Sequence, residues 1–248
     1  MSENKHKRSV QIAQDEVMDD LLHGELKLVQ HRKGYRYSVD ALLLASFALR
    51  RAEGKKVLDM GAGTGVIALI LACRAAPARV AAVELQPGLA DLARKNVKLN
   101  QTSPPVEVFQ EDAMRLDNIF PPAEFDLVVS NPPFRSSSSG RVSSVPEKAL
   151  ARHEIMMSIE TWLKQAGHVV GPAGSICLVY PVDEQERLEK AASRLSLWPA
   201  RKQYACDRPG GRKKLMLVEL RSEKTETRLE PEVPIETESG RFSLDGYK

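Results

Sequence analysis

One stretch of this 248-residue chain restricts its fold more than any other: Val57-Leu58-Asp59-Met60-Gly61-Ala62-Gly63-Thr64-Gly65. An apolar run ends in an acid, three glycines follow at alternate positions, and an apolar helix-forming segment begins directly after them. Glycine adopts positive φ values without strain, so the backbone can turn sharply from strand to helix and come very close to a ligand. The stretch therefore predicts a strand, a glycine turn and a helix beside a nucleotide-like ligand.

The chain after this stretch alternates short apolar runs with helical patterns, which is typical of a parallel sheet with crossover helices. The sequence predicts strands at residues 55–60, 79–84, 106–110, 125–130 and 175–180, and helices at 65–76, 87–101, 155–170 and 183–195. Residues 198–206 and 213–220 alternate like an antiparallel hairpin. We therefore expect an α/β fold whose seven-stranded sheet closes with an antiparallel pair and carries helices on both faces.

Four segments are expected along the chain: a basic, flexible N-terminus (1–24), a hairpin and helix that cover the ligand site (25–54), the main domain (55–221), and a tail or terminal strand pair (222–248). The hairpin strands are predicted within residues 25–38, around His31-Arg32-Lys33-Gly34, and Ser38 is the expected N-cap of the next helix, through Ala45. In the tail, residues 229–235 and 241–247 are expected to pair or to be partly disordered. The serine-rich residues 135–144 cannot bury apolar area, which predicts a mobile loop.

The composition favours a globular protein outside a membrane. Hydrophobic residues make up 42% of the chain, and no apolar run approaches the roughly 18 residues that span a bilayer. The three cysteines are far apart, which indicates reduced thiols in a cytoplasmic protein, and neither Cys nor His shows metal-ligand spacing. The net charge is only +3, but residues 201–214 carry six basic side chains against Asp207 alone. Such a stretch suits a phosphate backbone, with a solvated loop as the alternative.

Asn131-Pro132-Pro133-Phe134 follows the predicted strand at 125–130 and indicates a reaction. Two prolines fix φ and lack backbone donors, so the turn presents carbonyl oxygens and one side-chain amide rigidly. An aromatic ring follows directly. A planar amine suits this arrangement, because the oxygens can accept its two hydrogens and the aromatic ring can stack on the base that carries it. An ordinary proline-rich turn is the alternative interpretation.

The glycine segment departs from the dinucleotide fingerprint, because Val66 stands at its last position. It resembles instead the S-adenosylmethionine loop of class I methyltransferases, whose sheet is Rossmann-like. That cofactor has a sulfonium and an ammonium group but no phosphate, so a carboxylate beside the glycines suits it. The resemblance implies a methionine site at Asp59, Gly61, Gly63 and Gly65, ribose binding by Glu84, adenine-amine binding by Asp112, and an adenine sandwich of Leu85 and Ala113. Leu85 and Ala113 could equally be ordinary core residues.

Asn131-Pro132-Pro133-Phe134 matches the methyltransferase motif for transfer to a nitrogen conjugated with a planar system. The resemblance implies that the Asn131 side-chain oxygen and the Pro132 carbonyl accept the two amine hydrogens and that Phe134 stacks on the base. The resemblance also places Asn131 beside the cofactor. The motif serves adenine N6 in nucleic acids, guanine N2 in ribosomal RNA and the glutamine amide of release factors, and it does not separate them. A non-catalytic cofactor-binding protein would leave the motif unexplained.

Residues 30–47 resemble the N-terminal segment of bacterial tRNA (adenine-N6)-methyltransferases, as do residues 151–154 and 211–219. The resemblance implies methylation of the adenine next to the anticodon of a valine tRNA by a monomer or homodimer. It implies cofactor contacts from Tyr37 and Asp40, and RNA contacts from Arg36, Arg152, His153 and Arg212. Phe134 replaces the commoner tyrosine and matches the guanine-N2 enzymes, which leaves ribosomal RNA as the alternative substrate. Further RNA contacts are expected from residues 201–214, the loop 135–148, and Lys5, Lys7 and Arg8.

Overall fold

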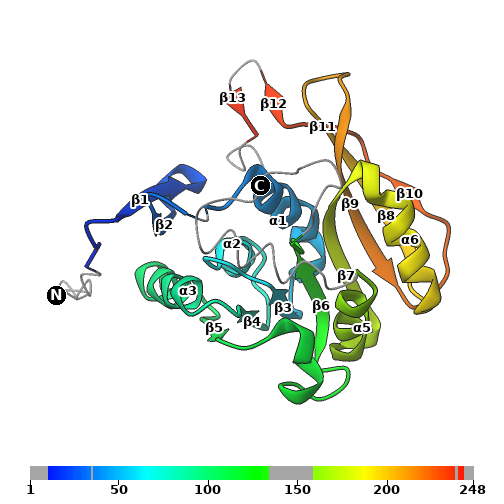
Figure 1. Ribbon diagram of the computed structural model, residues 1–248, viewed down its shortest axis with the longest axis horizontal. Coiled ribbons are helices and arrows are strands. Elements are labelled where there is room, and N and C mark those ends of the chain that lie inside the picture. The colour runs from blue at the N-terminus through cyan, green and yellow to red at the C-terminus, as the bar shows by residue number, and fades with distance from the viewer. Residues whose placement is uncertain (1–10, 35, 134–158, 238–239, 243–248) are drawn as a thin grey trace.

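The computed structural model describes residues 11–34, 36–133, 159–237 and 240–242. Within them, one large mixed sheet has the order β10-β8-β9-β7-β6-β3-β4-β5, with β11 beside β8 (Figure 1). The seven predicted strands are confirmed, and β9 is antiparallel to both of its neighbours. The seven strands are β3 (Lys56–Met60), β4 (Arg79–Val83), β5 (Val106–Phe109), β6 (Phe125–Ser130), β7 (Val170–Pro181), β8 (Trp198–Cys206) and β9 (Lys213–Arg221).

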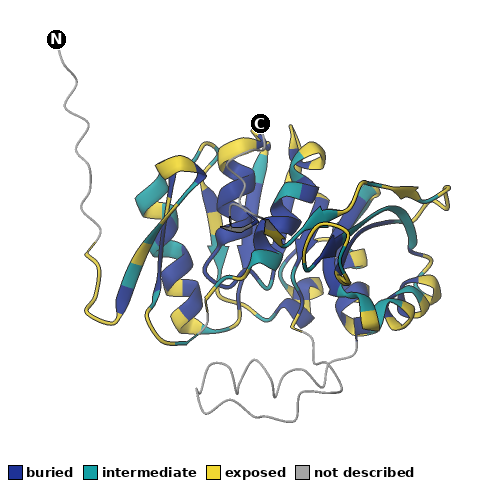
Figure 2. Ribbon diagram, turned by 90° about the horizontal axis from the view of Figure 1, so that it is seen from above, coloured by how far each residue is buried: buried dark blue, intermediate teal, exposed yellow. Residues whose placement is uncertain are grey.

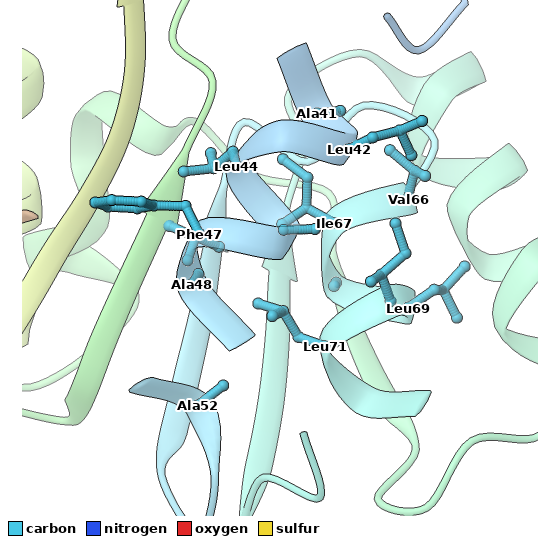
Figure 3. Packing of buried hydrophobic residues seen from close by; sticks show 14 of the residues in the cluster. Ala41, Leu42, Leu44, Phe47, Ala48, Ala52, Val66, Ile67, Leu69 and Leu71 are labelled. Atoms are coloured by element: carbon cyan, nitrogen blue, oxygen red, sulfur yellow. The ribbon is translucent and has the colours of Figure 1, made fainter. Parts of the chain in front are cut away.

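Helices cover both faces of the sheet, and the residues between the layers are buried (Figures 1 and 2). Figure 3 shows Ile67 and Leu71 of α2 directed towards α1, which explains why α2 is apolar nearly all round. Burying one such side chain contributes roughly 1.5–3 kcal/mol. No helix in the described ranges is long and apolar enough to cross a membrane. One face carries α1 (Val39–Ala52), α2 (Val66–Arg74) and α3 (Pro87–Asn100), and the other carries the 3-10 segment η2 (Ala113–Asn118), α5 (Ile159–Val169) and α6 (Gln185–Arg194).

The parallel strands end at one edge of the sheet, which gathers the predicted site residues. Asp59 on β3 is in register with Ala82 on β4 and Val129 on β6, so the segments after these three strands are neighbours. The loop between β8 and β9 lies at the same edge, because Pro181 at the end of β7 is in register with Leu215. This carboxyl edge is where open α/β sheets bind ligands.

The predicted N-terminal hairpin has the wrong boundaries. Its strands are β1 (Glu16–Leu21) and β2 (Leu26–His31), so the partner of β2 precedes it and lies within the segment expected to be a flexible N-terminus. The turn holds Leu22 and His23 at positive φ (53° and 54°), a conformation that non-glycine residues rarely adopt. Burial of the Leu22 side chain offsets this strain. Only Gly24 marks the turn in the sequence, whereas residues 31–34 contain a glycine among polar residues and resemble a turn.

Helix α3 holds the hairpin through two asparagine side chains. Asn96 is fully buried; its Oδ1 accepts the backbone N–H of Val29 at 2.7 Å, and its Nδ2 donates to the Val29 carbonyl at 3.1 Å. One turn further on, Asn100 makes the same pair of bonds with the backbone of Lys27. The two asparagine side chains therefore hydrogen-bond the backbone groups on the edge of β2 that faces away from β1. Helix α1 begins after Ser38, as predicted, but continues seven residues beyond Ala45 to Ala52 because Phe47, Ala48 and Ala52 are buried.

The tail extends the sheet and, as predicted, also forms a short strand pair of its own. Its short strands β10 (Arg228–Leu229) and β11 (Val233–Pro234) run parallel to β8, which would otherwise be an edge strand with unpaired backbone groups. A small pair, β12 (Glu236–Thr237) and β13 (Gly240–Arg241), follows. Phe242 is buried in the α1 side of the core, so the tail is attached to the main domain.

Candidate active site

Asp59, at the carboxyl end of β3, is the most buried acid of the site. It is 0% exposed; its Oδ2 accepts the N–H of Ala68 at 3.0 Å, while Oδ1 has no hydrogen-bond partner among the described residues. Burial, with a smaller contribution from the nearby Glu84 charge, raises the pKa of Asp59 to about 7 against the lowering effect of that hydrogen bond. A buried acceptor without a partner is unfavourable by itself. It suits a ligand that brings a cationic donor.

The glycine loop, residues 61–65, follows directly and has the backbone that the sequence predicts. Gly61, Gly63 and Gly65 have φ values of 77°, 57° and 80°. The N–H groups of Gly61 and Ala62 donate to the Val83 carbonyl, both at 2.9 Å. A Cβ on Gly65 would lie 3.3 Å from that of Ala93, so the loop also needs glycine for its packing on α3.

Glu84, directly after β4, is hydrogen-bonded to the glycine loop. Its Oε2 accepts the Gly63 N–H at 2.8 Å, and its Oε1 accepts the Gln86 N–H at 2.9 Å. These bonds fix the carboxylate at the strand end where the sequence predicts a ribose. Next to it, Leu85 is 36% exposed, unusual for a large apolar side chain at a strand end and consistent with a ring-binding surface.

Asp112 and Ala113 follow β5 at the same edge. The Asp112 side chain caps η2 by accepting the Met114 N–H at 2.8 Å, and Ala113 is buried. Asp112 therefore has a local structural role that the sequence did not predict. Its contact with an adenine amine, and the ring contact of Ala113, stay predictions.

Asn131 follows β6, on the strand next to β3, so the structure brings it to the edge that carries Asp59 and the glycine loop. It is half-buried, Pro132 is buried and Pro133 is exposed. The remaining residue of the motif, Phe134, lies outside the described residues, as do Arg152 and His153, the loop 135–148, and Lys5, Lys7 and Arg8.

The segment that leads from the hairpin into α1 is held by buried Gln30. Its Oε1 accepts the Tyr37 N–H at 3.0 Å, and its Nε2 donates to Asp19 at 2.6 Å. Arg36, predicted to contact RNA, forms a 2.8 Å ion pair with the same Asp19 carboxylate. Burial raises the pKa values of both Tyr37 and Asp40, which the sequence placed at the cofactor.

The basic stretch 201–214 is only partly exposed, so fewer of its basic side chains are available to bind RNA than expected. Arg201 is 11% exposed, pairs with buried Glu219 at 2.9 Å and stacks on Phe47. Lys202, equally buried, pairs with Glu189 at 2.6 Å. The sequence does not reveal this because the partner acids lie on other elements. Arg212 pairs weakly with Asp183, Lys213 pairs with Glu232, and Arg208 and Lys214 make no ion pair with the described residues.

Four buried polar residues at the site were not found from the sequence. Asn96 donates to the Thr64 carbonyl at 3.0 Å and so joins the glycine loop to the hairpin. Gln30, Ser130 and Trp162 connect neighbouring segments in a similar way. Asn96 had one available signal: it is a polar residue on the face of α3 that carries Leu89, Leu92 and Ala93. Among the described residues, no group of three metal-ligating side chains is present.

This sheet order, with an Asp-x-Gly-x-Gly-x-Gly loop after its central strand and an acid after the next, defines a class I methyltransferase. The profile of the Methyltransferase small domain family matches residues 38–195, and the chain belongs to this family. It is 32% identical over 186 residues to the tRNA1(Val) (adenine(37)-N6)-methyltransferase of Bacteroides thetaiotaomicron, which covers 74% of this chain and 75% of that protein. The Photobacterium profundum enzyme of the same name is 28% identical over 215 residues, or 85% and 87% of the two chains.

Solved structures share the fold at lower identity. A predicted O-methyltransferase from Agrobacterium tumefaciens has a TM-score of 0.63 at 20% identity, over 82% of this chain and 91% of its own. M. jannaschii TYW2, solved in complex with AdoMet, has a TM-score of 0.57 at 16% identity, over 84% and 86%. These likenesses concern the fold, and they confirm the predicted fold class.

Proposed function

We propose that this protein uses S-adenosylmethionine to methylate the exocyclic N6 amine of an adenine in tRNA, next to the anticodon of a valine tRNA. The observation that carries the proposal is the position of Asn131, directly after β6 and beside the strand that bears the glycine loop. The names of the relatives support the same substrate. Cofactor contacts and substrate contacts then meet at one sheet edge.

The residues at this edge fit S-adenosylmethionine. The unpartnered Oδ1 of Asp59 matches the ammonium group, the Glu84 carboxylate matches the ribose hydroxyls, and exposed Leu85 matches the adenine face. Once bound, this cofactor supplies an electrophilic methyl group on a sulfonium sulfur. The protein supplies position, charge and exclusion of water.

Asn131 and Pro132 act on the target amine. An exocyclic amine is a poor nucleophile because its lone pair is delocalised into the ring. If the Asn131 side-chain oxygen and the Pro132 carbonyl each accept one of its hydrogens, the nitrogen becomes more tetrahedral and its lone pair becomes available. No side chain has to remove a proton before attack, since the methylated product is cationic and then loses one. Positioning of this kind contributes up to about 7–11 kcal/mol in favourable reactions.

The RNA approaches from the β7–β9–β8 side of the same edge. Arg208, in the loop between β8 and β9, and Lys214, at the start of β9, make no ion pair with the described residues, and Arg212 in the same loop makes a weak one. Anticodon-loop bases are unpaired already, so inserting one into the site costs less than flipping it from a duplex.

The substrate is tested by incubating the enzyme and labelled S-adenosylmethionine separately with total tRNA, total ribosomal RNA and a release factor. After digestion, N6-methyladenosine from tRNA is the expected product. N2-methylguanosine from ribosomal RNA would select the alternative substrate, and label on protein glutamine would reject RNA.

The role of Asn131 is tested in the same assay. Asn131→Ala should lower turnover at least about 100-fold, the usual cost of losing a group that stabilises only the transition state. Cofactor affinity, measured by calorimetry, should change less than about threefold. Asn118→Ala, an exposed asparagine on η2, is the matched control. Parallel loss of cofactor binding would show that Asn131 is misassigned.

A further inference from the structure

The glycine loop and the turn at residues 131–133 belong to different crossover units of the sheet. Methyl transfer needs them at a fixed spacing, because one would hold the donor and the other the amine. The strands β3 and β6 are paired only up to Asp59 and Val129, and both loops begin beyond the last paired residues. A direct contact between the two segments beyond this pairing would fix the spacing of the two loops.

Trp162 on α5 makes that contact with both loops. Its indole N–H donates to the Ser130 hydroxyl at 3.0 Å, and that hydroxyl donates to the Met60 carbonyl at 2.6 Å. Ser130 immediately precedes Asn131, and Met60 immediately precedes Gly61. One side chain is thus connected, through one hydroxyl, to the last residue before each loop.

The indole ring also packs on the glycine loop itself. A Cβ on Gly61 would lie 3.2 Å from Cη2 and 3.3 Å from Cζ2 of Trp162, which is too close for an unstrained contact. Gly61 therefore has two reasons to be glycine: its φ of 77° and the ring above it. The ring is 7% exposed and the Ser130 side chain is buried, so water does not compete for these bonds.

We propose that Trp162 is a positioning residue for methyl transfer, which sets the distance between the glycine loop and Asn131. The proposal rests on the proposed function of this edge as a methyl-transfer site. Any buried tryptophan has to pair its N–H, so the pairing alone would fit an ordinary core residue. Here the single polar atom of the ring is bonded at the point where the two loops diverge.

The kinetic test uses Trp162→Phe in the full chain, which keeps an aromatic ring but removes the N–H. A displacement near 1 Å between reacting groups can lower turnover by about 100-fold, so we expect kcat to fall between about tenfold and 100-fold. KM for S-adenosylmethionine should stay close to the wild-type value, and the smaller ring should lower the unfolding midpoint without unfolding the protein at the assay temperature. Trp198→Phe is the same substitution at the amino end of β8, away from the carboxyl edge that carries the site. It should leave kcat unchanged.

A double-mutant cycle and fluorescence separate positioning from packing. Because the two bonds form one chain, Trp162→Phe combined with Ser130→Ala should be no slower than Ser130→Ala alone. In Trp198→Phe, the remaining indole fluorescence comes from Trp162, and it should change on titration with S-adenosylhomocysteine. In Trp162→Phe it should not.

Three results would overturn the proposal: kcat of Trp162→Phe within twofold of that of Trp198→Phe, a loss of turnover matched by an equal loss of cofactor affinity, or no change of Trp162 fluorescence on binding. The kinetics use whichever acceptor the wild-type protein methylates. A wrong RNA substrate would therefore refute the proposed function and leave this test intact. If no acceptor is methylated, the fluorescence result decides.

Discussion

The buried carboxyl group of Asp59 should make the free protein less stable in its charged form. Its pKa rises from an ordinary 3.8 to about 7 because the side chain is fully buried and Glu84 is near. Below pH 3.8 the group is neutral in both the folded and the unfolded chain, so it costs nothing. As the pH rises from 3.8 to about 7, this carboxyl group ionises in the unfolded chain before it ionises in the folded protein. The free energy of unfolding therefore falls progressively over this pH range.

Asp59→Asn removes that titration while keeping an oxygen that can accept the Ala68 N–H. A shift from 3.8 to about 7 corresponds to at most about 4 kcal/mol. At pH 8 the variant should therefore be more stable than the wild type by a few kcal/mol, and the difference should approach zero near pH 4. Cofactor binding should nevertheless be lost, because the neutral amide does not attract a cation.

The assay is chemical denaturation of both proteins from pH 4 to pH 8, with Asp20→Asn, an exposed carboxylate on β1, as the control. Calorimetry adds a second measurement. An ammonium-bearing ligand favours the carboxylate, so wild-type binding of S-adenosylmethionine at pH 6 should release protons and strengthen towards pH 8. A variant that is less stable than the wild type at pH 8, or binding without proton release at pH 6, would refute the reasoning.

Two further predictions concern the N-terminal hairpin and the RNA surface. Asn96→Ala removes the partners of the Val29 backbone and of the Thr64 carbonyl. The free energy of unfolding should therefore fall by about 2–4 kcal/mol, and cofactor affinity should weaken. Unchanged cofactor affinity would mean that the hairpin is not coupled to the glycine loop. Replacing both Arg208 and Lys214 by alanine should lower the slope of log affinity for tRNA against log salt concentration by roughly two units; an unchanged slope would place the RNA elsewhere.

The elements that the sequence predicted well are those whose signals are local. Strand β6 begins and ends where expected, and α3 differs from its prediction by one residue, because apolar periodicity and the flanking prolines act within a few residues. The order of the strands then follows from the connection rules of parallel sheets, which bring Asp59, Glu84 and Asn131 to one edge. For these residues, the motif spacing was enough.

The sequence could not determine which partner a side chain or strand selects across the fold. Strand β1 is paired through a turn that two non-glycine residues form, and Arg201 is drawn inward by Glu219, 18 positions away. Trp162 resembles any core aromatic until its N–H is seen to reach Ser130. Local propensity depends on neighbours in the chain, whereas hydrogen bonds and buried charges depend on neighbours in space. The residues that gather at this edge could therefore be predicted from sequence motifs, but the contacts that hold them in position were decided only by tertiary packing.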